Sequence, residues 1–186
     1  LLSVEMDEVS TRFFDKETSS YDPFLMKDMD NAVSRILHAI DDQESIAIFG
    51  DYDADGITST ALLTEVLDHL GAKVIPYVPE REEGYGVNTK AIEYLQELGI
   101  SLIITVDCGI RSPEELRYAQ ELGMEVIVTD HHVPGEVIPD VHSVVCPMVD
   151  GDEYPDKNLS GVGIAYKLAQ ALFQKSRGSR EFADYW

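Results

Sequence analysis

The fold of this chain can be predicted outward from residues 46–56, IAIFGDYDADG. The stretch begins as a short apolar run, which is typical of a parallel strand buried on both faces. Asp51, Asp53 and Asp55 follow directly. Like charges this close repel one another, so the cluster survives folding only if solvent or cations neutralise it. Taken alone, the stretch fits either a solvated acidic turn or a metal site.

The same succession of an apolar run and an amphipathic segment recurs along the chain. Apolar runs predict strands at residues 45–49, 73–78, 101–106, 125–129 and 142–145. Helical spacing and helix-end signals predict helices at residues 28–40, 58–70, 88–98, 112–122 and 160–175. This alternation predicts an α/β fold of three layers, αβα, around a mostly parallel sheet of about five strands. We expect residues 1–44 to form an arm and a helix packed on a domain of residues 45–186.

The composition narrows the class of protein. With 186 residues, the chain is long enough for one well-buried α/β domain. We expect no signal peptide at its start, and it has no apolar run of the roughly 20 residues that a membrane helix needs. Cys108 and Cys146 form no CxxC pair, which favours a reducing, cytoplasmic compartment.

The charge of the chain is strongly acidic. Its 14 lysines and arginines stand against 35 aspartates and glutamates, which gives a net charge of −21. This argues against a nonspecific nucleic-acid coat, which needs a basic face. Cations bound by a carboxylate site would offset only part of the charge.

Side chains of metal-ligand type follow three of the predicted strands. Asp107 comes directly after the strand at 101–106, and the run Asp130, His131, His132 comes after the strand at 125–129. Because parallel strands end at one edge of the sheet, these residues share a rim with the acidic run of residues 51–55. Three convergent loops are poorly explained as solvated turns. The sequence therefore predicts a metal centre at this rim.

The ligand types narrow the choice of ion. Carboxylates and imidazoles without thiolates suit Mn²⁺, Mg²⁺, Zn²⁺ or Fe²⁺. Four or more ligands, with Asp107 central enough to bridge, predict two ions about 3.5–4 Å apart, an arrangement that serves in-line displacement at phosphorus. Carboxylates favour Mn²⁺ or Mg²⁺, and the histidine favours Mn²⁺ of these two.

Four ordered motifs resemble the DHH phosphoesterase superfamily, whose name-giving motif stands at residues 130–132. They are GDYDADG (50–56), VDCG (106–109), TDHH (129–132) and LSGVGIAYKL (159–168). Within it, YDPFLMKDMDNAVSRI (21–36) and the loop PEREEGYGVN (79–88) are similar to the RecJ-like exonucleases. The resemblance implies a metal-dependent 5′→3′ exonuclease of single-stranded DNA in repair and recombination, with a single-strand-binding protein or a helicase as a partner.

The resemblance also implies roles for individual residues. Asp53 and Asp107 would hold one Mn²⁺, and Asp55, Asp107 and His131 would hold the other, with Asp107 as the bridge. His132 would face the scissile phosphate and stabilise negative charge there. Two further residues would be auxiliary, either ligands or supports of ligands: Asp51 and Asp130.

Two departures from the family pattern stand out. Phe49 occupies a place where some superfamily members have a histidine, so Asp51 or water would complete the shell of that ion. The family also has a fourth motif, with another metal-binding aspartate, followed by a DHH-associated domain and often an OB-fold. We expect this chain to be the catalytic-domain fragment of a larger enzyme, with an incomplete second metal site. The remaining parts would then carry the basic surface.

Three further residues each fit two roles. Arg81 could reach a substrate phosphate from the rim, or pair with Glu80 or Glu83. Gly161 could offer its backbone N–H to a phosphate, or allow tight helix packing. Tyr85 could stack on a base or pack within its loop.

Other functions compete with the exonuclease. The nearest is a DHH phosphodiesterase for short oligonucleotides or cyclic dinucleotides. A non-catalytic replication scaffold of the same superfamily is another, although scaffolds have lost metal ligands that this chain retains. A receiver domain also has acidic residues at its strand ends, but it does not need the DHH motif.

Overall fold

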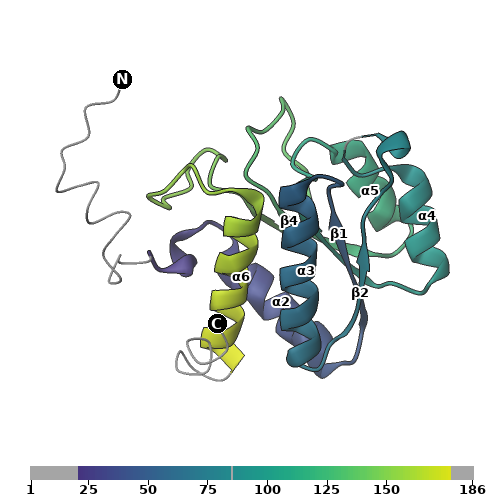
Figure 1. Ribbon diagram of the computed structural model, residues 1–186, viewed down its shortest axis with the longest axis horizontal. Helices are drawn as coiled ribbons and strands as arrows, with labels where there is room; N and C mark the ends of the chain where they lie inside the picture. The colour runs from purple at the N-terminus through teal and green to yellow at the C-terminus, as the bar shows by residue number, and fades with distance from the viewer. Residues whose placement is uncertain (1–20, 85, 177–186) are drawn as a thin grey trace.

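A parallel sheet of five strands forms the centre of the protein in the computed structural model, which describes residues 21–84 and 86–176 (Figure 1). The strands lie in the order β2-β1-β3-β4-β5, and every neighbouring pair is parallel. Their bounds are Ser45–Gly50 for β1, Lys73–Tyr77 for β2, Leu102–Val106 for β3, Glu125–Thr129 for β4 and Ser143–Val145 for β5. The predicted α/β fold is confirmed.

Helices cover both faces of the sheet. Their bounds are Pro23–Leu25 for η1, Met29–Asp41 for α2, Ala54–His69 for α3, Arg81–Glu83 for η2, Thr89–Glu97 for α4, Pro113–Glu121 for α5 and Gly161–Ser176 for α6. The core on one face is built by α2, α3 and α6, and the core on the other by α4 and α5. Figure 1 shows the two groups on opposite sides of the strands. None of the helices in residues 21–84 and 86–176 is both long and apolar enough to cross a membrane.

The central strands β1 and β3 consist almost wholly of apolar residues because both of their faces are buried, whereas the edge strand β2 is partly exposed. In β1, Ile46 and Ile48 belong to the core under α2, α3 and α6, whereas Ala47 and Phe49 belong to the core under α4 and α5. Successive side chains of a strand point to opposite faces, so an unbroken apolar run fills two cores at once.

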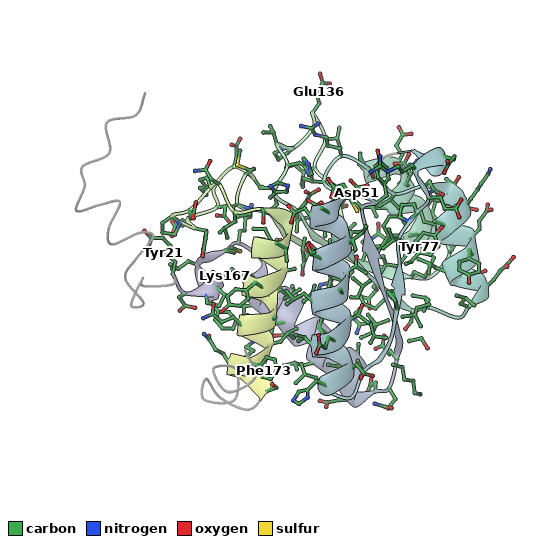
Figure 2. The ribbon with its side chains drawn as sticks, viewed as in Figure 1. Tyr21, Asp51, Tyr77, Glu136, Lys167 and Phe173 are labelled. Carbon is green, nitrogen blue, oxygen red and sulfur yellow. The ribbon has the colours of Figure 1, made fainter. Side chains whose placement is uncertain are left out.

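The strand order fixes where a ligand can bind. The chain passes from β1 outward to β2 and then returns to the other side of β1 to form β3. The loops that follow β1 and β3 therefore run to opposite faces and leave a crevice at the carboxyl ends of these strands. Figure 2 shows Asp51, after β1, and Glu136, after β4, at the same end of the molecule, opposite Phe173.

The prediction that a helix starts at residue 58 is wrong: α3 begins at Ala54. Asp53 is its N-cap, and one of its carboxylate oxygens accepts the N–H groups of Asp55 at 2.9 Å and Gly56 at 3.0 Å. Such a cap satisfies N–H groups that have no partner in the first turn. The acidic run thus ends inside a helix, and Asp55 occupies the first turn.

The helix expected in residues 1–44 shares the main core of the domain. Met29, Ala32, Val33 and Ile36 of α2 are fully buried in the same cluster as residues of α3 and α6. The arm predicted for the start of the chain falls largely in residues 1–20, outside the described residues. The boundary at residue 44 stays a prediction.

Candidate metal centre

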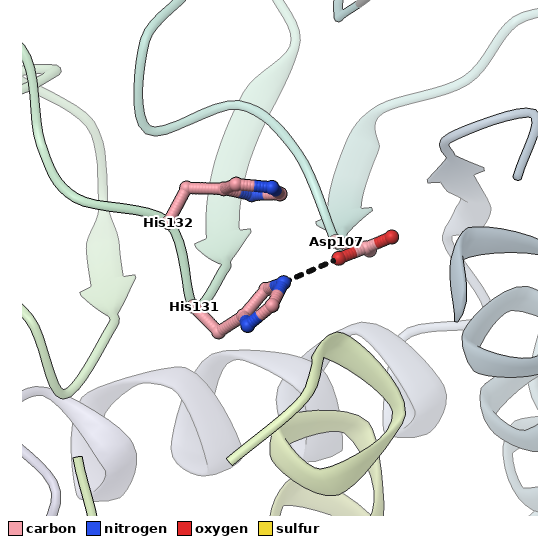
Figure 3. A group of neighbouring side chains, drawn as sticks. All are labelled: Asp107, His131 and His132. Atoms are coloured by element: carbon pink, nitrogen blue, oxygen red, sulfur yellow. Dashed lines mark ion pairs between the residues drawn. The ribbon is translucent and has the colours of Figure 1, made fainter. Parts of the chain in front are cut away.

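Asp107 lies at the centre of the site, directly after β3. Its φ is 60°, in the left-handed region, which aspartate tolerates better than most residues. Its N–H donates to the carbonyl of Thr129 at 3.1 Å, which ties it to the end of β4. The side chain is buried, and Figure 3 shows it facing His131 and His132 across the gap between two loops.

The surroundings of Asp107 disfavour its charged form. Burial raises the pKa of its carboxyl to about 8, helped by the negative charges of Asp55 and Asp53. Oδ1 lies 3.1 Å from Nε2 of His131 (Figure 3), but no described residue meets it with hydrogen-bond geometry. A buried carboxylate oxygen without a hydrogen bond is costly to desolvate. A cation at this position would stabilise the ionised form.

Two groups of donor atoms meet at Asp107. One comprises Asp51, Asp53 and Asp107, and the other comprises Asp107, His131 and His132; the donor atoms within each group lie within 4.8 Å of one another. Asp51 is buried, its Oδ1 has no hydrogen-bond partner among the described residues, and burial raises its pKa. The loops after β1, β3 and β4 thus supply two adjacent sets of oxygen and nitrogen donors that share one carboxylate.

Asp130 organises the loop after β4 and is absent from both donor groups. Its Oδ1 accepts the N–H groups of His131 at 2.7 Å and His132 at 3.1 Å, and lies 2.7 Å from Nδ1 of His132. Its Oδ2 accepts the N–H of Ile110 at 3.0 Å. The bond to Asp130 raises the pKa of His132, although burial opposes the shift. A buried carboxylate therefore holds the backbone of both histidines and orients the ring of His132.

Asp55 is likewise absent from both donor groups, although the sequence predicted it as a ligand. Its two oxygens accept the N–H groups of Gly161 and Val162, each at 2.7 Å, and its Oδ2 lies 3.9 Å from Nε2 of His131. The carboxylate therefore caps the N-terminus of α6, where the helix dipole favours negative charge. No local pattern in the sequence could reveal this contact, because the partners are more than 100 positions apart.

Gly161 closes the site from the α6 side. A Cβ atom at this position would overlap the carboxylate of Asp107 and lie 2.6 Å from its Cβ. The N–H of Gly161 donates to Asp55 and so does not point to a substrate phosphate in this structure. Of the two roles that fit the sequence, the contacts agree with close packing, and a role in substrate binding stays a prediction.

Arg81 lies at the rim on the β2 side. Its guanidinium carbon is 5.5 Å from the ring centroid of Tyr52, which lies between Asp51 and Asp53, and this distance suits a cation–π contact. Its predicted contact with a phosphate stays a prediction. Tyr85 lies outside the described residues.

A family model confirms the relationship that the motifs indicated. The model of the DHH family, N-terminal domain, matches residues 45–185. The chain belongs to the DHH family. The match to the DHH family starts at the first residue of β1 and includes every residue of the two donor groups.

DHH proteins similar to this chain include named exonucleases. It is 52% identical over 158 residues to the single-stranded-DNA-specific exonuclease RecJ of Bacillus subtilis (strain 168), an alignment that covers 84% of this chain and 20% of that protein. A crystal structure of exonuclease RecJ bound to manganese matches with a TM-score of 0.74 and 42% identity over 81% of this chain and 38% of that one. RecJ from Thermus thermophilus in complex with Mn²⁺ matches with a TM-score of 0.70 and 38% identity, over 81% and 21%. The chain thus spans about a fifth of the length of its Bacillus relative.

Proposed function

We propose that this chain is the catalytic domain of a metal-dependent 5′→3′ exonuclease that hydrolyses phosphodiester bonds of single-stranded DNA. The observation that carries the proposal is the pair of donor groups sharing Asp107 at the crevice between β1 and β3. The names of the relatives supply the substrate class: they are single-stranded-DNA-specific exonucleases. Polarity, and a role in DNA repair and recombination, rest on the resemblance alone.

The donor set fits two divalent cations. Buried carboxylate oxygens without hydrogen-bond partners, on Asp51 and Asp107, are the kind of atom that a hard cation stabilises. We assign Mn²⁺ as the cofactor, with Mg²⁺ as the alternative, because oxygen donors predominate and imidazole is present. Bound there, two cations would activate water and stabilise the attacking and leaving oxygens of an in-line displacement.

The ligand assignment follows the donor groups. Asp51, Asp53 and Asp107 would hold one ion, and Asp107 and His131 would hold the other; His132, the third member of the second group, is assigned to the substrate phosphate instead. This gives Asp51 a larger role than the sequence suggested. Asp55 would act on the site through its bonds to α6, and a direct bond to the second ion remains part of the proposal because Oδ2 lies 3.9 Å from Nε2 of His131.

His132 would stabilise negative charge on the scissile phosphate. Its bond to Asp130 fixes the ring and favours the imidazolium form, since that bond raises the pKa of His132. A cationic imidazole beside a phosphoryl group stabilises the charge that develops in the transition state. Asp130 would therefore act through His132, as the carboxylate that orients it.

The wider context of the enzyme is part of the proposal. We place the catalytic function in residues 45–186, with α2 packed against them, and we propose a single-strand-binding protein or a helicase as a partner. The net charge of −21 disfavours contact with DNA over a broad surface. Substrate contact by this chain would therefore be confined to the metal centre and the cations beside it.

The test uses the protein at its full length and 5′-labelled single-stranded DNA, with and without Mn²⁺. We expect release of labelled mononucleotides that needs the metal and disappears in an Asp107→Asn variant. Asparagine keeps the size of the side chain and tolerates the left-handed backbone, so the variant removes the charge with little change in shape.

Three outcomes would contradict the proposal in different ways. Cleavage of dinucleotides alone would assign the protein to the small-substrate phosphodiesterases. Absence of hydrolysis with any divalent metal, in a folded protein, would favour a scaffold. Hydrolysis that survives Asp107→Asn would overturn the assignment of the metal centre while leaving the substrate class intact.

A further inference from the structure

Arg111 joins the two loops that carry the donor residues. It lies four positions after Asp107, and its Nε donates to the carbonyl of Val133 at 2.8 Å, directly after the histidine pair. The loop is fixed at its base, because the N–H of Ile110 donates to Asp130 and that of Ser112 donates to the carbonyl of Gly109. The position of Arg111 is thus set by the same carboxylate that orients His132.

The guanidinium of Arg111 is exposed and has no acidic partner within ion-pair distance among the described residues. Some other cations of this acidic chain pair with carboxylates: Arg35 with Glu44, Lys157 with Asp152, and Lys175 with Asp30. An arginine kept without a carboxylate partner beside a cluster of carboxylates suits an anionic ligand.

The loop that carries Arg111 and the helix α6 lie on opposite faces of the sheet. Ile110 packs in the core under α4 and α5, whereas Gly161 closes on Asp107 from the other face. Arg81, after β2, lies beyond the loop that carries Asp51 and Asp53. The donor groups are therefore flanked by a cation on the β2 side and by a second cation where the loops after β3 and β4 meet.

We propose that Arg111 binds a phosphate of the single-stranded substrate next to the phosphate at the metal centre. The inference rests on the proposed function and adds a substrate contact to it. A guanidinium has five N–H donors in a planar fork that matches phosphate oxygens, and the bond to Val133 uses only the Nε donor. Because the chain as a whole repels DNA, a fixed cation at the rim contributes to where the strand enters.

A purely structural role for Arg111 makes a different prediction. If the side chain only ties the two loops together, its hydrogen bond to Val133 matters and its charge does not. Arg111→Gln keeps a donor for that carbonyl and removes the charge. Arg111→Lys keeps the charge but lacks the planar set of N–H donors of a guanidinium. Comparing these two variants separates the roles, and Arg111→Ala removes both features.

The experiment measures binding of 3′-fluorescein-labelled oligothymidylate by anisotropy, with the full-length protein. All variants carry Asp107→Asn so that the strand is not degraded, and salt is varied between about 50 and 200 mM. We expect Arg111→Ala and Arg111→Gln to bind about fivefold more weakly and to reduce the slope of log K against log salt by about 0.7, the loss of one phosphate contact on a single strand. Arg111→Lys should keep the slope. Arg117→Ala, which removes an exposed arginine paired with Glu121 at 3.9 Å, is the matched control and should bind like the parent.

Two results would overturn the phosphate contact. Unchanged affinity and slope in Arg111→Gln, with the parent binding DNA normally, would show that the charge is not used. Equal weakening in Arg111→Lys and Arg111→Ala, with a lower melting temperature in both, would assign Arg111 to bracing the loops. A full-length protein with Asp107 intact that neither binds nor hydrolyses single strands in Mn²⁺ would instead overturn the proposed function, so the two failures are distinguishable.

Discussion

The two ends of the sheet treat their carboxylates in opposite ways. At the amino end, Arg35 of α2 bonds to Glu44, before β1, at 2.6 and 3.1 Å and to Glu125, at the start of β4, at 2.7 Å. At the carboxyl end, Asp51 and Asp107 are buried, and each has an oxygen without a hydrogen bond among the described residues. The hydrogen bond from Arg35 lowers the pKa of Glu44, whereas burial raises that of Asp107 to about 8.

These opposite pKa shifts indicate that the carboxylates at the amino end stabilise the fold, whereas those at the carboxyl end are suited to binding a ligand. A carboxylate whose pKa is lowered by a cation contributes to stability when it is ionised. A carboxylate whose pKa is raised by burial costs stability when it is ionised, unless a ligand compensates. Strongly shifted groups gathered in a crevice are typical of functional sites. The protein thus completes its ion pairs at one end of the sheet and leaves carboxylate oxygens open at the other.

The largest difference between substitutions at the two ends of the sheet is expected in the rate of hydrolysis. Asp107→Asn should lower Mn²⁺-dependent hydrolysis of single-stranded DNA by the full-length protein by more than about 100-fold, since even outer-shell residues of metal sites cost 10–100-fold. Glu125→Gln, at the amino end, should leave the rate within about twofold, because surface ion pairs contribute to stability rather than to chemistry. Initial rates of mononucleotide release measure both.

The same pair of variants also tests stability. Without metal, Asp107→Asn should be at least as stable as the parent near neutral pH, because it removes a carboxyl group whose pKa burial raises to about 8 and whose ionisation therefore opposes folding. A loss of stability in Asp107→Asn comparable to its loss of activity would mean that Asp107 is a structural residue, and the contrast between the two ends would fail.

The next largest effect is expected at Gly161. Gly161→Ala should lower the free energy of unfolding by about 1–3 kcal/mol, the usual cost of overpacking, because its Cβ would overlap the Asp107 carboxylate. It should also weaken Mn²⁺ binding, measured by titration calorimetry on metal-free protein.

Gly163→Ala is the matched control in the same helical turn. Its Cβ would meet Leu159 at 3.3 Å, a contact that a small shift relieves, and alanine is the better helix former by about 1 kcal/mol. We expect it to be neutral or stabilising and to bind Mn²⁺ normally. Equal effects of the two substitutions would show that α6 does not shape the carboxyl end.

Removing the ion pairs at the amino end of the sheet should lower the free energy of unfolding and leave the activity unchanged. Arg35→Met keeps the aliphatic packing of a side chain that is only 10% exposed, but leaves Glu44 and Glu125 without their cation. We expect a loss of about 1–2 kcal/mol in urea unfolding, more than the 0–1 kcal/mol of an exposed pair, because the arginine is largely buried and meets two carboxylates. Arg117→Met, which removes the exposed pair with Glu121, should change stability by less than about 0.5 kcal/mol.

The smallest expected effect is the pH dependence of Glu44. Since its pKa is lower in the folded than in the unfolded state, its contribution is present above the unfolded pKa of about 4.3 and is lost as the pH falls through the folded pKa. The stability difference between the parent and Glu44→Gln should therefore shrink on acidification from pH 6 to pH 3, by about 1 kcal/mol at most. Urea unfolding at several pH values measures it, and a difference that grows towards acid pH would contradict the sign.

The sequence predicted the strands better than it predicted the start of α3 or the residues of the candidate metal centre. The apolar runs predicted all five strands, because burial on both faces leaves few polar positions in the central strands. The start of α3 was misplaced by four residues, since Asp53 was considered only as a candidate ligand and its role as the N-cap was not predicted. Asp51 was expected to be auxiliary, but its burial and its place in a donor group make it a main candidate.

By itself, the sequence determined a parallel α/β sheet, the edge at which ligands bind and the residue types that reach this edge. These follow from local periodicity and from the rule that parallel strands end together. Only the tertiary structure decided that α6 begins against Asp55 and Asp107, that Asp130 orients His132, and that Arg35 joins two strands at the amino end. The physical reason is that most of these contacts join residues far apart in the chain, whose meeting depends on strand order, crossovers and close packing, and even the short bond from Asp130 to His132 depends on how its loop folds.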